Sequence, residues 1–247
     1  MEVVFVGSGE AFDENRHNIS ILVNSKTKLL LDCGYNVPQS LWEYNSNPNF
    51  LDGVYISHFH ADHYYGVLPL ILRMEEDGRK KEFTIIGQKG VKESILNALE
   101  LSWKGWSDLT RYPFNIEFVE IGGSLSFNEL ELSFALTSHV IPNYAIKVAL
   151  KERSMCYSGD GAPTEESKNL YQGTNLLAHE LCTPDKPVGG HATVKDIVKL
   201  LQETKLGRLA LVHIMRTFLK RRDIILNEFQ GLKSDVFIPD DLQEVKL

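Results

Sequence analysis

Four side chains able to bind a metal ion are crowded into the six residues His58-Phe59-His60-Ala61-Asp62-His63. A β-branched and apolar run over residues 54–57 precedes them and predicts a short strand. On an extended segment His58 and His60 project to the same side, so one cation can meet both. If the chain then turns into a helix near Asp62, the side chains of Asp62 and His63 aim toward a second cation. Imidazole and carboxylate suit Zn²⁺, Mn²⁺ or Fe²⁺ better than Ca²⁺ or Mg²⁺, so the cluster predicts a transition-metal site.

Further ligand-type residues stand at the ends of later predicted strands. His139 follows the strand predicted over 130–136, Asp160 ends the run 155–159, and His213 ends the run 209–212. Each alone would more often be a hydrogen-bonded polar residue than a ligand. Because all three share the same local setting, and polar residues at strand ends often carry chemistry, they are interpreted as one constellation with the cluster.

The rest of the chain has the pattern of a globular protein rich in strands. Its 43% hydrophobic and 24% charged residues exclude disordered and fibrous classes, and no repeat or linker divides it, so residues 1–247 are expected to form one domain. Further strands are predicted over 3–6, 19–23, 28–31, 83–86, 116–119, 145–150 and 176–181, and helices over 62–74, 91–103, 194–204 and 218–229. Pro69 is expected to shorten or kink the first helix.

Charge, cysteines and hydropathy narrow the function classes. With Lys+Arg 26 against Asp+Glu 33, the net charge of −7 gives no global attraction to nucleic acid. The cysteines Cys33, Cys156 and Cys182 form no disulfide framework and are expected to be buried, which suits a cytoplasmic protein. The N-terminal apolar run is too short for a signal peptide, and no stretch approaches the ~20 apolar residues that cross a bilayer, so no membrane role is expected.

The cluster resembles the signature of the metallo-β-lactamase-fold hydrolases. His139, Ser158-Gly159-Asp160 and Val212-His213 follow in that family's order, and Asp32-Cys33-Gly34 resembles its early D-x-G element. The resemblance implies an α/β fold (α+β in some schemes), a four-layer αβ/βα sandwich with two divalent metal ions at the edge between the sheets. Carried over by position, it makes His58, His60 and His139 ligands of one metal and Asp62, His63 and His213 ligands of the other, with Asp160 bridging. Zn²⁺ is the first expectation, with Mn²⁺ or Fe²⁺ as alternatives.

Within that family the chain is most similar to ribonuclease Z-like proteins. Gly7-Ser8-Gly9-Glu10 with Arg16-His17-Asn18 resembles their opening motif, and the residues from His63 to Pro69 resemble their D-H-x-x-G-L-P. Gly190-His191-Ala192-Thr193 resembles the element whose histidine lies beside the metals, which implies that His191 helps to protonate the leaving oxygen. Asp62 is a second catalytic candidate, as acceptor of a proton from the nucleophilic water. His179 is as readily explained by packing.

Two departures argue against a large tRNA substrate. Only residues 140–158 separate His139 from Asp160, where ribonuclease Z carries a long tRNA-binding arm, and Ile-Met-Arg-Thr replaces the S-x-R-Y that usually follows the last histidine. The basic runs 79–81 and 220–222 are interpreted as solvated or helix-terminal charges. A small phosphodiester is therefore the expected substrate, such as a cyclic nucleotide, a short oligonucleotide or a phospholipid-derived headgroup.

Other functions stay open. A lactonase, thioesterase or sulfatase is the leading competitor, because the same metals activate water for those electrophiles. An iron dioxygenase would keep the same motif, whereas His60 argues against diiron oxidoreductases and the intact ligands argue against a pure binding role. The aromatic segment 103–114 is interpreted as core, with a lid or dimer contact as the alternative, and a homodimer stays open because dimers are common in the resembling group.

Overall fold

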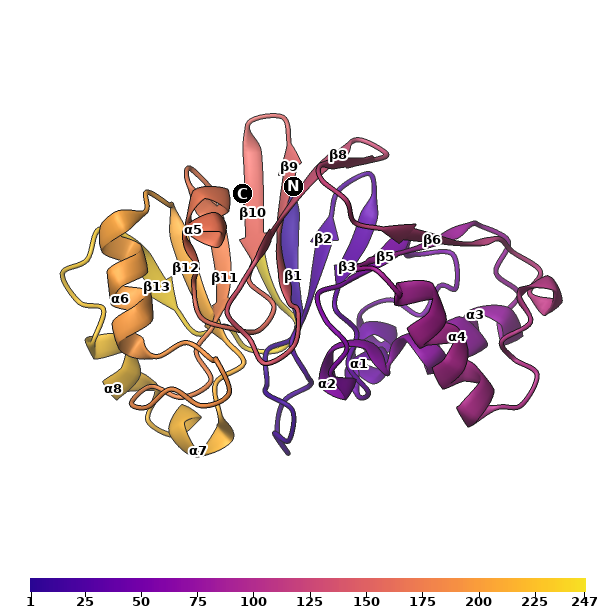
Figure 1. Ribbon diagram of the computed structural model, residues 1–247, viewed down its shortest axis with the longest axis horizontal. Helices are drawn as coiled ribbons and strands as arrows, with labels where there is room; N and C mark the ends of the chain where they lie inside the picture. Colours follow the sequence, from indigo (N-terminus) through magenta and orange to yellow (C-terminus); the bar gives the residue numbers. More distant parts are fainter.

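The computed structural model describes residues 1–247 and contains two seven-stranded β-sheets that pack face to face (Figure 1). The first sheet has the order β14-β1-β2-β3-β4-β5-β6 and the second the order β13-β12-β11-β10-β9-β8-β7. The strands of the first sheet are β1 (Glu2–Gly7), β2 (Ser20–Asn24), β3 (Lys28–Leu31), β4 (Gly53–Ile56), β5 (Phe83–Gly87), β6 (Ile116–Glu120) and β14 (Gln243–Lys246). Those of the second are β7 (Leu125–Phe127), β8 (Leu130–Leu136), β9 (Tyr144–Leu150), β10 (Arg153–Tyr157), β11 (Leu176–Glu180), β12 (Arg208–Val212) and β13 (Asp235–Phe237).

Each sheet is antiparallel in one half and parallel in the other. In the first sheet the pairs β3–β4, β4–β5 and β5–β6 are parallel, and in the second the pairs β10–β11, β11–β12 and β12–β13 are parallel. Parallel strands end at the same edge of a sheet, and ligand sites in such sheets lie beyond the carboxyl ends of the strands. The segments that follow β4, β10 and β12 are therefore brought to comparable edges of the two sheets.

Helices cover the outer face of each sheet, which confirms the predicted α/β sandwich of four layers. Figure 1 shows α1 (Val37–Tyr44), α2 (Ala61–Tyr64), α3 (Val67–Glu76) and α4 (Val91–Ser102) on one flank, and α5 (Glu165–Tyr171), α6 (Val194–Glu203), α7 (Arg216–Leu219) and α8 (Arg222–Asn227) on the other. Side chains alternate between layers as the period of a strand requires. In β1, Val3 and Phe5 lie in the core between the sheets, whereas Val4 and Val6 lie in the core under α1 and α3.

The prediction of one continuous helix over 62–74 was wrong. The stretch is divided into α2 and α3 at Tyr65 and Gly66, and Pro69 lies in the first turn of α3, where its missing N–H breaks no helical bond. The break coincides with a close backbone approach, because a Cβ on Gly66 would lie 2.0 Å from the carbonyl oxygen of Gly34. This contact fixes the segment that carries Asp62 and His63 against the segment that follows β3.

The structure also has two helices where the sequence predicted one over 218–229. Residues 216–219 form α7 and residues 222–227 form α8, with Arg221 between them outside the helical region at φ −113° and ψ 31°. The stretch has neither proline nor glycine, so its apolar period alone predicted one continuous helix. Both short helices pack on the same core beneath α6 through Phe218 and Ile225.

The basic run 79–81 is not simply a solvated face, as the sequence had suggested. The Arg79 side chain is fully buried and donates to the carbonyl oxygens of four residues, Pro48, Leu51, Lys81 and Glu82. Arg79 therefore organises the loop before β4 and cannot bind a polyanion. In the aromatic segment 103–114, Tyr112 and Phe114 are buried as predicted, whereas Trp103 is 51% exposed.

The cysteines, the helix lengths and the chain ends complete the description of the fold. All three cysteines are free and buried, as predicted. No helix is long and apolar enough to cross a bilayer. The two chain ends lie side by side, because β1 and β14 pair antiparallel (Figure 1).

Candidate metal centre

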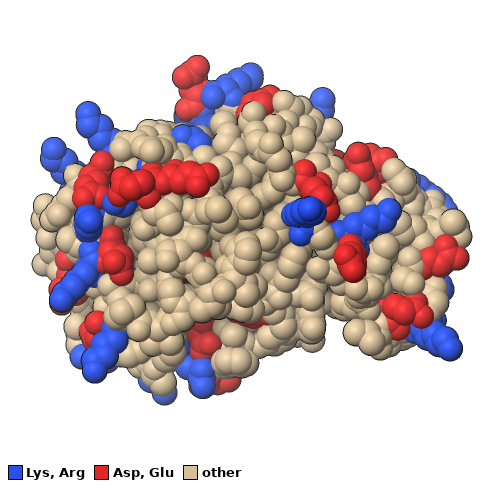
Figure 2. All heavy atoms as spheres, in the orientation of Figure 1, with Lys and Arg blue, Asp and Glu red and all other residues tan.

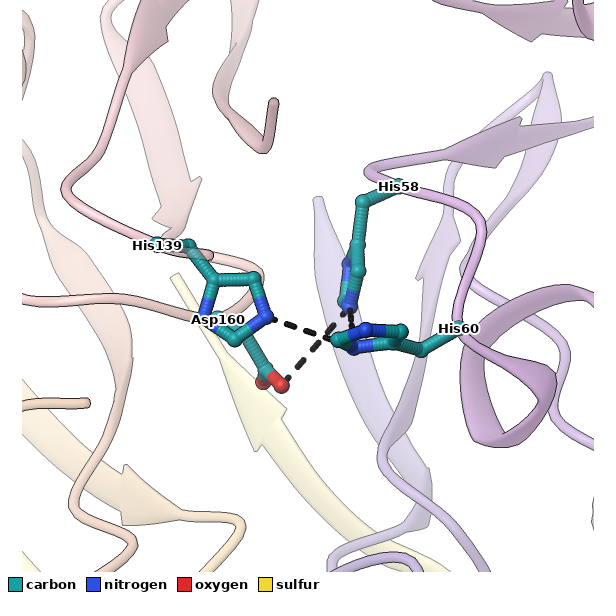
Figure 3. Close-up of side chains that lie close together, drawn as sticks. All are labelled: His58, His60, His139 and Asp160. Carbon is teal, nitrogen blue, oxygen red and sulfur yellow. Dashed lines mark hydrogen bonds and ion pairs between the residues drawn. The ribbon is translucent and has the colours of Figure 1, made fainter. Parts of the chain in front are cut away.

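The seven residues predicted as ligands come together at the edge shared by the two sheets. His58, His60, Asp62 and His63 follow β4 of the first sheet, and His139, Asp160 and His213 follow β8, β10 and β12 of the second. Figure 3 shows His58 and His60 pointing from one side toward His139 and Asp160 on the other. The centre is thus built from both sheets.

The first set of side chains is formed by His58, His60, His139 and Asp160, whose ligand atoms all lie within 4.8 Å of one another. Nδ1 of His60 lies 3.0 Å from Nε2 of His58 and 3.3 Å from Nε2 of His139. Three ring nitrogens at such distances are arranged like the ligands of one small cation.

The second set is formed by Asp62, His63 and His213, also within 4.8 Å of one another. Oδ2 of Asp62 lies 3.4 Å from Nε2 of His63 and 3.3 Å from Nε2 of His213. The short helix α2 begins at Ala61, directly after His60. Because the backbone changes from extended to helical there, the side chains of Asp62 and His63 point in another direction than those of His58 and His60.

The Asp160 carboxylate lies between the two sets. Its Oδ2 is 3.7 Å from Nε2 of His58, while its Oδ1 is 3.4 Å from Nε2 of His63 and 3.7 Å from Nε2 of His213. One oxygen thus faces each set. This is the arrangement expected of a carboxylate shared by two cations.

Two glycines and one asparagine hold Asp160 in this position. Gly159 and Gly161 have φ values of +59° and +105°, a backbone region that favours glycine. The amide of Asn143, which is fully buried, accepts from the Asp160 N–H at 3.1 Å and donates to the Ser158 carbonyl at 2.9 Å. The loop after β10 is therefore fixed from both the backbone and a neighbouring side chain.

Asp32, the residue after β3, orients one histidine of each set. Its Oδ2 lies 2.7 Å from Nδ1 of His63 and accepts from Oγ of Ser57 at 2.7 Å. Since the Ser57 hydroxyl donates to Asp32, it accepts from Nδ1 of His58, 3.0 Å away. Both rings then carry their proton on Nδ1 and leave the Nε2 lone pair facing the centre, which is the tautomer that a metal ligand needs.

The polar atoms left without partners test whether these residues fit metal ions. Nε2 of His63, Nδ1 of His139 and Oδ1 of Asp160 are buried and have no hydrogen-bond partner. Buried polar atoms are nearly always paired, because leaving one unsatisfied costs about 1–3 kcal/mol. Two of these atoms, on His63 and Asp160, face each other across the centre, so the donor set fits bound cations.

The surroundings of the histidines shift their pKa values in two opposite directions. Burial lowers the pKa of His58 well below its usual range and that of His139 to about 4, so both rings are neutral, the form that binds metal. At His63 and His213 burial also disfavours charge, but Asp160 and Asp62 outweigh it and raise the pKa of both rings. The carboxylates therefore favour positive charge at the second set, which is the charge that a cation supplies.

His191 lies over the centre. Its ring stacks on His213 with centroids 5.6 Å apart and meets the edge of His139 at 4.9 Å. Its Nδ1 is 3.3 Å from Oε1 of Glu180, a fully buried carboxylate that also accepts from the backbone N–H groups of Gly161, Cys182 and Ala192. Burial opposes charge on His191, but the contact with Glu180 outweighs it and raises the pKa of the ring.

The other two histidines lie apart from the centre. His179 is fully buried, donates from Nδ1 to the Glu180 carbonyl and packs against Tyr171, which agrees with the packing interpretation. His17 pairs with Asp241 at 3.0 Å and ties the N-terminal loop to the C-terminal segment. The pair His179-Glu180 resembles a pair in ribonuclease Z-like proteins, but the function of Glu180 was not predicted. The function of Asn143 was not predicted either, because nothing in its local sequence distinguishes it from other buried polar residues.

Comparison with known proteins agrees with this geometry. Ribonuclease Z of Methanosarcina mazei is 27% identical over 303 aligned residues that cover 100% of this chain and 98% of the relative. The metallo-β-lactamase fold protein YhfI of Bacillus subtilis superposes with a TM-score of 0.84 at 21% identity, covering 99% of this chain and 98% of that protein. The short form of human tRNase Z superposes with a TM-score of 0.80 at 19% identity, covering 100% and 98%.

Fold and relatives define a metal-dependent hydrolase of the metallo-β-lactamase fold, similar to ribonuclease Z, as the sequence motifs predicted. The family model of the Anti-Pycsar protein Apyc1 matches residues 1–230. The chain belongs to that family.

Proposed function

We propose that this hydrolase cleaves a small phosphodiester, with a nucleotide as the preferred substrate, by means of two divalent cations. His58, His60 and His139 hold one cation, Asp62, His63 and His213 hold the other, and Asp160 is shared by both. The observation that carries the proposal is the position of Asp160, whose two oxygens face different sets of side chains. Five imidazoles and two carboxylates favour Zn²⁺, with Mn²⁺ or Fe²⁺ as alternatives.

When bound, such cations act as Lewis acids that activate water and polarise the ester. The chain's own residues then supply the proton transfers. Asp62, with one oxygen close to His63 and His213, accepts a proton from the attacking water. His191 carries a proton that the Glu180 carboxylate helps to retain, and it donates this proton to the leaving oxygen.

The preference for a small substrate follows from what lies around the centre. The alignment with the Methanosarcina mazei ribonuclease Z extends over 303 positions, whereas this chain has 247 residues, so the relative carries insertions that this chain lacks. Between His139 and Asp160 the chain forms only β9, a tight turn and β10. On the face drawn in Figure 2, Lys and Arg are interspersed with Asp and Glu and form no continuous basic surface for a long polyanion.

Three exposed aromatic side chains, on chain segments around the helix α2 that carries Asp62 and His63, suit the base of a nucleotide. Phe12 is 74% exposed, Tyr35 46% and Tyr65 45%, and we call them the aromatic rim. Tyr35 follows Gly34 and Tyr65 precedes Gly66, the two glycines whose backbones are in contact, and the Tyr35 hydroxyl donates to the carbonyl of Ala11, next to Phe12. Exposed aromatic rings stack on bases of any sequence.

Both halves of the chain contribute ligands, which supports the proposal that residues 1–247 act as one domain. Three buried free thiols support a cytoplasmic location.

A substrate screen tests the proposed function. Protein loaded with Zn²⁺ or Mn²⁺ is offered a phosphodiester, a phosphomonoester, a lactone, a thioester and a sulfate ester. We expect phosphodiester turnover that is lost in Asp160→Ala and retained in Asp77→Ala, a matched change at the exposed end of α3. Turnover confined to the lactone or thioester would contradict the proposal, and full activity in Asp160→Ala would contradict the role of Asp160.

A further inference from the structure

A buried tyrosine from the second sheet contacts the residue that orients the histidines of the first. Tyr157 is the last residue of β10 and is fully buried in the core between the sheets. Its hydroxyl donates to Oδ2 of Asp32 at 2.8 Å, although the two residues are 125 positions apart. The contact therefore crosses from one sheet to the other directly beneath the candidate metal centre.

The Asp32 oxygen that receives this hydrogen bond also holds one histidine of each set. Oδ2 accepts from Ser57 at 2.7 Å and contacts Nδ1 of His63 at 2.7 Å, and Ser57 in turn contacts His58. The other oxygen, Oδ1, accepts from the Ser57 N–H. Among the hydrogen-bond partners of the carboxylate, Tyr157 alone comes from the second sheet.

Tyr157 also lies close in sequence to Asp160. Only Ser158 and Gly159 separate them, and the Ser158 N–H and carbonyl are both bonded, to the Ala178 carbonyl and to the Asn143 amide. The short segment between Tyr157 and the carboxylate of Asp160 is thus held by hydrogen bonds, so the positions of the two side chains are fixed relative to each other. The ring has only two side-chain torsions and is packed on all sides, so it couples the two sheets rigidly.

We propose that Tyr157 is a positioning residue that raises the metal affinity of the centre, by fixing the Asp32 carboxylate and the histidines it orients relative to Asp160. This inference rests on the proposed metal-binding function. Partners that orient metal-binding histidines typically change metal affinity by 10–100-fold when removed. A phenylalanine at this position keeps the ring and its packing and removes only the hydroxyl, while Asp32 keeps its bonds to Ser57 and His63.

The test compares Tyr157→Phe with Tyr171→Phe in the full chain. Tyr171 is also fully buried, but its hydroxyl has no hydrogen-bond partner and it packs in the core under α6, so the matched change removes an oxygen that positions nothing. Zn²⁺ affinity is measured by competition with a chromophoric chelator, and the absorption spectrum of the Co²⁺-loaded protein reports the geometry of the ligands. Thermal unfolding of the metal-free proteins reports the effect on folding.

We expect Tyr157→Phe to weaken Zn²⁺ binding at least about 10-fold and to alter the Co²⁺ spectrum, with a metal-free melting temperature within about 4 °C of the wild type. Tyr171→Phe should match the wild type in all three measurements. Unchanged Zn²⁺ affinity in Tyr157→Phe would overturn the inference, and so would a metal-free variant that no longer folds, because the hydroxyl would then serve the fold.

The readout also separates this inference from the proposed function. Wild-type protein that binds Zn²⁺ but cleaves no phosphodiester would contradict the substrate proposal, while the affinity comparison would still decide the role of Tyr157. Wild-type protein that binds neither Zn²⁺ nor Co²⁺ would overturn both.

Discussion

The Glu180 carboxylate is fully buried and lies 3.3 Å from Nδ1 of His191, while the His191 ring lies on the candidate metal centre. Glu180 also accepts hydrogen bonds from the backbone N–H groups of Gly161, next to Asp160, and Ala192, next to His191. One carboxylate thus fixes the orientation of His191, the backbone next to His191 and the backbone next to Asp160. Such a partner keeps one His191 proton on Nδ1, and by raising the pKa of the ring it favours a second proton on Nε2, the one that the leaving oxygen receives.

Glu180→Gln should lower kcat more than it lowers metal affinity. The amide keeps the size of the side chain but no longer supplies the negative charge that raises the pKa of His191, so proton donation to the leaving oxygen weakens. We expect a loss of roughly 10–100-fold in kcat, less than the loss in His191→Ala, because general acid catalysis contributes about 10²–10⁴-fold. Steady-state kinetics and chelator competition on the same preparations check this. Full activity in both variants would refute the assignment of His191.

Removal of metal should destabilise the protein. Cations compensate the buried carboxylates Asp62 and Asp160 and the unpaired ring nitrogen of His63, so they bind the folded chain better than the unfolded one. At metal concentrations near 1,000 times the dissociation constant, linkage predicts that a chelator lowers the melting temperature by roughly 10 °C. Asp160→Ala should show a smaller shift. An identical melting temperature with and without chelator would contradict a bound metal.

Gly66→Ala should disturb the centre from a position outside it. The added Cβ would lie 2.0 Å from the Gly34 carbonyl and 2.9 Å from Sγ of Cys33, so α2, which carries Asp62 and His63, must shift. We expect a loss of about 1–3 kcal/mol in unfolding free energy together with a marked loss of activity. Gly122→Ala is the control, because its Cβ meets nothing within 4 Å. Chemical denaturation and turnover, measured side by side, decide between them.

The sequence predicted the centre better than it predicted the elements around it. The seven expected ligands stand beside ends of strands, and because parallel strands end at one edge, their meeting could be anticipated; their binding of metal stays a prediction. The division of α2 from α3 could not be anticipated, because it depends on contact between Gly66 and Gly34, far apart in sequence. The helix α1 was not predicted, although its proline, Pro38, lies at its start, where a helix tolerates proline.

The residues that hold the ligands in position could not be predicted from the sequence, for a related reason. Tyr157 lies at the end of a buried strand, and its sequence neighbours give no sign that its hydroxyl meets Asp32 in the other sheet. Asn143 likewise holds Asp160 across a loop. Such roles depend on which residues become neighbours after folding, and a local pattern does not encode that.

Stability in acid should depend on Glu129, far from the centre. Its carboxylate accepts from the N–H and hydroxyl of Thr27 at 2.7 and 2.6 Å and from the Ser25 hydroxyl at 3.0 Å. Burial opposes its charge, but the hydrogen bonds from Thr27 and Ser25 outweigh it and lower the pKa to about 2 from an ordinary 4.5. A lowered pKa stabilises the fold above pH 4.5, and this contribution is lost as the pH falls toward 2.

Glu129→Gln should therefore lower the unfolding free energy by about 1–2 kcal/mol at pH 7 and by less at pH 3. Thermal unfolding across this pH range measures the difference. Glu76→Gln, at an exposed position on α3, serves as the control and should leave the pH profile unchanged. A Glu129→Gln profile parallel to that of the wild type would contradict the prediction, because it would mean that folding does not change the pKa of Glu129.

Tyr65→Ala should weaken the binding of a nucleotide and leave the chemical step intact. Tyr65 is 45% exposed at the end of α2, directly after the segment with Asp62 and His63, so its ring is available to a base beside the scissile ester. Stacking of a base on an aromatic ring is worth about 1–3 kcal/mol, which predicts a rise in KM of roughly 10-fold with little change in kcat. Tyr65→Phe should retain the wild-type KM, since stacking needs the ring and not the hydroxyl. Trp103→Ala removes an aromatic ring of similar exposure from the segment after α4 and should have no effect, so an equal rise in KM there would remove the support for the aromatic rim.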